Sequence, residues 1–126
     1  MKKKSIQVLD ISDEQVIEKL SKLGLRRNMA KMLVVLAQVD ELTSKELEQI
    51  ANLRQPEVSV AAGMLQKRGW AKQRRIKGKG KGRPAHVYSM KKPFDEILRD
   101  MEIEKEKELE SVKKLISDVA KAFPRS

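Results

Sequence analysis

The sequence predicts a mainly α-helical fold with one small β-hairpin (α+β) and a long C-terminal helix. Apolar residues recur at helical spacing through most of the 126 residues. Only 3% of the residues are aromatic, so aliphatic side chains must supply the core, which favours packing of helix on helix. One stretch rich in glycine and lysine breaks the helical pattern and predicts the hairpin. We expect one domain over residues 1–92 and a separate terminal helix over 93–126.

The composition excludes several classes of function. The chain has no cysteine and a single histidine, His86, so disulfides, thiolate catalysis and a zinc site are not expected. It has no GxxxxGK[ST] motif and no recognisable pairing of nucleophile and base. No apolar run approaches the roughly 18 residues that span a bilayer. We therefore expect a soluble cytoplasmic protein that is not an enzyme and has no catalytic residue, metal or cofactor.

Two helices are expected first. Ser12 is the predicted N-cap of a helix over about 13–23, with Gln15 in the capping-box position and Gly24 ending the helix. Its apolar stripe consists of Val16, Ile17, Leu20 and Leu23. A second helix should begin near Asn28. Its core residues are expected to be Met29, Met32, Leu33, Leu36 and Val39.

The next two helices are short and close together in sequence. Thr43 followed by Glu46 is a capping box at the start of the first. After a tight break, Pro56 suits the first turn of a helix over about 56–68, because its missing N–H costs nothing there. Gly69 ends this helix. Two short helices joined by about four residues form a helix-turn-helix arrangement.

A hairpin over about 70–90 follows and lies within the basic part of the chain. The segments 70–76 and 85–90 are expected to pair as strands around the tip Gly78-Lys79-Gly80-Lys81-Gly82-Arg83-Pro84. Eleven of the 28 basic residues and no acidic residue lie between Lys67 and Lys92, leaving 17 basic residues against 18 acidic ones elsewhere. This stretch therefore carries the whole excess charge of +10. It predicts a surface for a polyphosphate, with a solvated basic loop as the alternative.

The last segment, from Phe94 to Phe123, contains no internal glycine or proline and would form a helix roughly 45 Å long. An apolar seam with 3-4-3-4 spacing runs along its second half and consists of Leu109, Val112, Ile116, Val119 and Phe123. This spacing favours a coiled coil with a second copy of the chain. Folding back onto the domain, or an exposed helix, are the alternatives.

In this order the motifs resemble the winged-helix transcriptional regulators of archaea and bacteria, the MarR and TrmB-like group. The residues that carry the resemblance are Leu53-Arg54-Gln55-Pro56-Glu57-Val58-Ser59, Leu65, Arg68-Gly69-Trp70, Gly82-Arg83-Pro84 and Tyr88. The resemblance implies a winged helix-turn-helix domain with a C-terminal dimerisation helix. The helix over 56–68 would enter the major groove, and the hairpin, or wing, would reach the backbone or minor groove. This chain departs from its relatives at Val60 and Gly63, where they often carry Arg or Lys.

We therefore predict a sequence-specific, homodimeric transcriptional regulator that binds double-stranded DNA. The DNA contacts expected from the recognition helix are Arg54, Gln55, Glu57, Ser59, Val60 and Lys67. Those expected from the wing are Arg74, Arg75, Lys77, Lys79, Lys81 and Arg83. The five residues of the apolar seam are the expected dimer contacts. The sequence identifies no small-molecule effector.

Three alternatives accompany this prediction. Glu57 either accepts a hydrogen bond from cytosine or supplies a favourable charge at a helix N-terminus. Trp70 is expected to fill the core, with stacking on a base as its alternative. For the whole chain, the alternative function is a winged-helix module that binds chromatin or RNA without sequence specificity, or a protein-interaction piece of a larger assembly.

Overall fold

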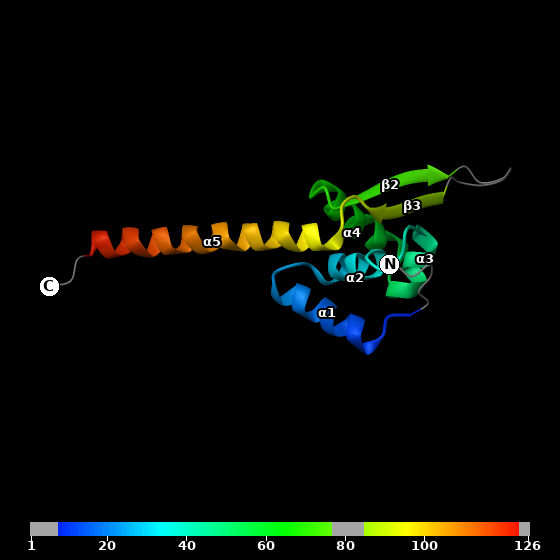
Figure 1. Cartoon of the computed structure of the whole chain (residues 1–126), viewed down its shortest axis with the longest axis horizontal. Helices are drawn as coiled ribbons and strands as arrows, with labels where there is room; N and C mark the ends of the chain where they lie inside the picture. The colour runs from blue at the N-terminus through cyan, green and yellow to red at the C-terminus, as the bar shows by residue number, and fades with distance from the viewer. Residues whose placement is uncertain (1–7, 77–84, 124–126) are drawn as a thin grey trace. The chain divides into compact units, whose positions relative to one another are not determined.

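The computed structural model describes residues 8–76 and 85–123, and the chain divides into two compact units between Phe94 and Asp95. In the first unit the described helices are α1 (Ile11–Lys22), α2 (Arg27–Leu36), α3 (Ser44–Ala51) and α4 (Gln55–Lys67). Its strands are β1 (Leu42–Thr43), β2 (Ala71–Ile76) and β3 (Ala85–Met90). The long helix α5 (Phe94–Ala122) runs through the second unit (Figure 1). The predicted α+β class is confirmed.

The N-cap predicted for the first helix is wrong. Helix α1 begins at Ile11, and its N-cap is Asp10 in place of Ser12. Asp10 Oδ1 accepts the Asp13 N–H at 2.8 Å, and Asp13 Oδ2 accepts the Asp10 N–H at 3.0 Å. This reciprocal pair of carboxylates satisfies free N–H groups at the helix start, which extends the helix toward the N-terminus. Asp13 also accepts a hydrogen bond from Gln38 Nε2 at 2.9 Å, which ties α1 to the end of α2.

The core of the first unit lies around α2. The residues expected there are all buried, so the prediction that the α2 methionines pack in the core is confirmed. On α1, Ile17 and Leu20 are buried, whereas Val16 and Leu23 are partly exposed, so the predicted stripe is only half correct. Helix α2 is also linked to α3, because Lys31 Nζ donates to the carbonyl of Ala51 at 3.2 Å. A cation here stabilises the C-terminal end of α3.

The helix-turn-helix forms through the predicted local contacts. At the start of α3, Glu46 Oε1 accepts the Thr43 N–H at 2.9 Å and Thr43 Oγ1 accepts the Glu46 N–H at 3.1 Å, which confirms this capping box. Asn52 then adopts the left-handed conformation with φ of 54°, which turns the chain toward α4. Helix α4 ends before Gly69, which has φ of 75°.

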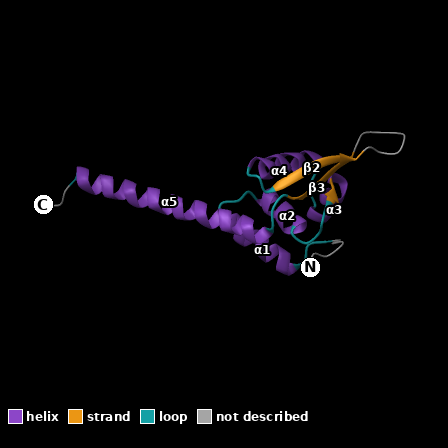
Figure 2. Cartoon of the chain, turned by 45° about the horizontal axis from the view of Figure 1, so that its top comes forward, coloured by secondary structure: helices purple, strands orange, loops and turns teal. Residues whose placement is uncertain are grey.

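The sheet has three antiparallel strands in the order β1-β3-β2. Strands β2 and β3 form the hairpin seen in Figure 2. Strand β1 was not expected from the sequence, because two residues are too short to show a pattern of alternation. Its register pairs Leu42 with Tyr88 and Thr43 with Val87. The central strand β3 therefore has a partner on each side, and Val87 and Tyr88 are both buried.

Helix α5 is continuous, close to the predicted bounds. Ile97 and Met101 are buried, and the helix is exposed from Glu102 onward. No helix in the described ranges is both long enough and apolar enough to span a membrane.

Candidate nucleic-acid interface

Helix α4 presents its predicted binding residues to solvent. Its inner side is formed by the buried residues Val58, Ala61, Ala62 and Leu65. All six residues predicted to contact DNA from this helix and its N-cap are exposed: Arg54, Gln55, Glu57, Ser59, Val60 and Lys67. Val60 is 58% exposed, which is unusual for a valine without a partner. The outer face of α4 is therefore open and combines polar side chains with one apolar side chain.

Glu57 is engaged at the N-terminus of its own helix. Its carboxylate oxygen Oε1 accepts the Arg54 N–H at 2.8 Å. This bond satisfies an N–H group at the helix start, where a negative charge is also favoured by the helix dipole. The contact supports the capping role of Glu57 over direct recognition of a base.

Gly63 leaves a gap in the side chains on the exposed side of α4. A Cβ atom built there would meet no heavy atom within 4 Å. Packing therefore does not require a glycine at this position. Its absence of a side chain does allow another molecule to approach the helix backbone closely.

The hairpin of β2 and β3, which is the described part of the wing, is connected to α4 through glutamines. Gln66 Nε2 of α4 donates to Gln73 Oε1 of β2 at 3.0 Å, and Gln73 Nε2 in turn contacts His86 Nδ1 of β3. This series of contacts crosses both strands of the hairpin, so the base of the wing is held beside α4 (Figure 2).

The two arginines predicted to act from β2 lie on opposite faces of the strand. Side chains alternate along a strand, so Arg75 shares a face with Gln73, which contacts α4, and Arg74 lies on the other face. Arg74 forms an ion pair with Glu41, with Nε and Oε2 3.2 Å apart. The structure therefore separates two residues that the sequence places in one group. The other predicted wing contacts, Lys77, Lys79, Lys81 and Arg83, lie outside the described residues.

Trp70 fills the core, as predicted. The side chain is 1% exposed, and the Arg68 guanidinium carbon lies 4.0 Å from the centroid of its ring. A cation over the face of an indole is attracted by the ring quadrupole. Nearby on β3, burial raises the pKa of the Tyr88 hydroxyl, so this side chain stays neutral at physiological pH.

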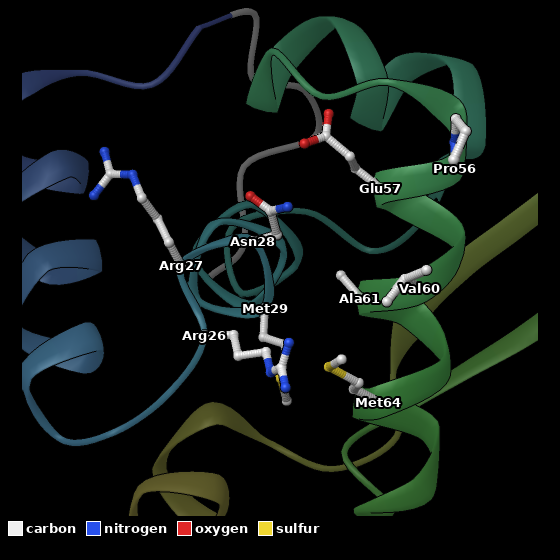
Figure 3. A pocket seen from close by; sticks show the side chains of 9 residues that line it. All are labelled: Arg26, Arg27, Asn28, Met29, Pro56, Glu57, Val60, Ala61 and Met64. Carbon is white, nitrogen blue, oxygen red and sulfur yellow. The ribbon is translucent and has the colours of Figure 1, made fainter.

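A groove of about 550 Å³ lies along the other flank of α4, and sequence reasoning missed it (Figure 3). We refer to it as the α2–α4 groove. Its lining residues are Arg26, Arg27, Asn28 and Met29 at the start of α2, and Pro56, Glu57, Val60, Ala61 and Met64 of α4. The only signal in the sequence is the basic pair Arg26 and Arg27 at the start of the second helix, which carries no acid in its first turn.

The apolar seam along the second half of the long helix is exposed. Its five residues are between 50% and 80% exposed: Leu109, Val112, Ile116, Val119 and Phe123. Leu115, at 64%, was missed because it lies beside the seam and outside the 3-4 spacing. Exposed aliphatic residues concentrated on one helix indicate an interaction surface.

Comparisons with known proteins agree on the fold. No protein-family model and no curated protein matches the sequence. Among solved structures, the chain is similar to TrmBL2, an archaeal chromatin protein that binds DNA, with a TM-score of 0.58 and 21% identity over 87% of this chain and 41% of TrmBL2. The chain thus spans about two fifths of the length of TrmBL2.

Two transcriptional regulators are also similar. The first has a TM-score of 0.55 and 20% identity over 89% of this chain and 75% of its own length. The second, PA4135, has a TM-score of 0.51 and 20% identity over 90% of each chain. The resemblance drawn from the sequence is confirmed at the level of the fold: this chain has the winged-helix fold of these DNA-binding and regulatory proteins.

Proposed function

We propose that the protein is a homodimeric transcriptional regulator that binds double-stranded DNA, with α4 in the major groove and the wing on the backbone or in the minor groove. The observation that carries this proposal is the contact between Gln66 and Gln73, which holds the exposed recognition helix next to the base of the most basic segment of the chain. A helix of this size fits the major groove, and basic side chains beside it neutralise phosphates. The similarity to TrmBL2 and to transcriptional regulators supports it.

Within this interface the residues have different roles. Gln55 and Ser59 are exposed polar residues near the start of α4, and an amide such as that of Gln55 can pair with adenine. Val60 is suited to contact a thymine methyl group. On β2 we assign a phosphate contact to Arg75 in preference to Arg74, because Glu41 already neutralises Arg74.

A second copy of the chain is the proposed partner of α5. The seam residues are well exposed over about four helical turns, and their spacing is that of a two-stranded coiled coil. Leu115 widens this surface on one side. Covering it with the same surface of another copy removes it from water and places two winged-helix domains in one molecule.

One observation favours a second function, binding of chromatin DNA without sequence specificity. Between Ser59 and Lys67 the outer positions of α4 include Val60 and Gly63, so this surface offers few groups that distinguish bases. TrmBL2 is itself described as a chromatin protein. In this case phosphate contacts supply nearly all of the affinity.

Fluorescence anisotropy with labelled duplexes at increasing salt tests both functions. We expect the logarithm of the association constant to fall linearly with the logarithm of salt concentration. A flat salt dependence, or no binding at low salt, contradicts DNA binding altogether. Fragments enriched from genomic DNA are then compared with random duplexes. A preference of about a thousandfold or more supports the regulator, and a ratio near one supports the chromatin protein.

A further inference from the structure

We propose that the α2–α4 groove receives the sugar–phosphate backbone of the DNA strand that runs along α4 on the side away from the wing, with Arg26 and Asn28 contacting its phosphates. This inference rests on the proposed binding of duplex DNA and extends it to residues of α2. It makes the interface two-sided: the wing grips one backbone, and the start of α2 grips the other.

The two flanks of α4 are occupied differently. Gln66 lies on the flank that contacts β2 of the wing. Val60, Ala61 and Met64 line the opposite flank, together with the start of α2 (Figure 3). The major groove is about 12 Å wide and a helix with its side chains is about 10–12 Å across. A helix inserted in the major groove has a phosphate backbone on each side. The α2–α4 groove therefore faces the DNA strand that the wing does not reach.

The groove has a net positive charge, because two arginines and one carboxylate line it. Arg27 donates to Glu14 Oε2 at 3.1 Å, and Glu57 accepts the Arg54 N–H at 2.8 Å. Arg26 is exposed and forms no ion pair or side-chain hydrogen bond within the described ranges. An arginine with an unoccupied guanidinium, beside the half-buried amide of Asn28, presents donors that match phosphate oxygens.

The rest of the lining suits the sugar part of the backbone. Met29, Val60 and Met64 give the groove an apolar wall, and its polar lining residues include Arg26 and Asn28 (Figure 3). A nucleic-acid backbone alternates deoxyribose rings, whose carbon atoms pack on apolar side chains, with anionic phosphates.

The test compares the unmodified chain with its Arg26→Ala and Lys114→Ala variants in the same salt titration. Both variants lose one positive charge, but Lys114 lies on α5, in the other unit. We expect Arg26→Ala to weaken binding to all duplexes about tenfold at low salt and to reduce the salt slope by roughly one. Arg26→Lys should retain the slope, and Lys114→Ala should behave as the unmodified chain.

Ethylation interference locates the contact. For the unmodified chain, modified phosphates should inhibit binding on both sides of the major groove, and Arg26→Ala should lose the inhibition on one side only. If Arg26→Ala and Lys114→Ala give the same slope, or the interference pattern is unchanged, the groove assignment is wrong while the proposed function stands. If the unmodified chain itself shows no salt-dependent binding, the proposed function fails, and this inference with it. Circular dichroism melting establishes that all three variants are folded.

Discussion

Two glycines of the first unit provide a paired test of how helix α4 is built. Gly63 lies inside α4 and Gly69 follows it with φ of 75°. An added Cβ would meet no atom within 4 Å at either position, so only the backbone conformation distinguishes the two sites. Gly63→Ala should stabilise the protein by up to about 1 kcal/mol, because alanine loses less conformational entropy in a helix. Gly69→Ala should destabilise it by about 1–2 kcal/mol, because the left-handed region is unfavourable for alanine.

Thermal unfolding followed by circular dichroism measures both effects. A change of 1 kcal/mol corresponds to a shift of about 4–8 °C in Tm for a domain of roughly 60–100 residues. We therefore expect the Tm of Gly63→Ala to rise and that of Gly69→Ala to fall. Shifts in the same direction would refute the reasoning, because they would mean that backbone conformation does not control the outcome.

The same pair also reports on DNA binding. The methyl group added at Gly63 occupies space on the face of α4 that we assign to the major groove, so the affinity for duplex DNA should fall although the protein is more stable. Gly69→Ala, measured well below its Tm, should bind as the unmodified chain. Unchanged affinity of Gly63→Ala would remove this part of α4 from the interface.

Three further predictions concern the dimer, the wing and the first helix. The double variant Val112→Glu and Ile116→Glu should be monomeric by light scattering. In a dimer it would bury two glutamates from each chain, four charges in all, in the proposed seam. A persistent dimer would place the interface elsewhere. Arg75→Ala should lower duplex affinity and the salt slope more than Arg74→Ala does, and the reverse order would contradict our assignment of the strand faces. Asp10→Ala should reduce the free energy of unfolding by about 1 kcal/mol in urea titrations, because α1 loses its cap; no change would show that Asp13 alone suffices.

The sequence predicted the elements whose formation depends on neighbouring residues. The capping box of Thr43 and Glu46 and the proline in the first turn of α4 act within a few residues, and both appear in the structure as expected. The first N-cap was misassigned because Ser12 and Asp10 are both good capping residues and spacing alone does not rank them. The N-cap is Asp10 because Asp13 Oδ2 accepts the Asp10 N–H, which completes a capping box between these two residues.

Features that depend on long-range contacts could not be predicted in this way. Strand β1 exists because Leu42 and Thr43 lie beside β3, more than forty residues away in the sequence. The ion pair of Arg74 with Glu41 follows from the same arrangement. Arg26 likewise becomes a candidate DNA contact only when the start of α2 is brought beside α4. The register of distant elements thus determines which of the many basic residues remain available to a ligand.

This distribution of available charge has a consequence for specificity. In the proposed interface Arg26 and the wing supply cations on two sides of α4, whereas the face of α4 between them carries the neutral groups Gln55, Ser59 and Val60. Phosphate contacts on both sides raise the affinity for every sequence equally and fix the depth of the helix in the groove. Discrimination between DNA sequences then depends on Gln55, Ser59 and Val60. It also depends on how easily a given DNA sequence deforms so that both of its phosphate backbones reach the protein. Substitutions at Gln55 should therefore change the preference among duplexes with little effect on the salt slope, whereas substitutions at Arg26 should do the opposite.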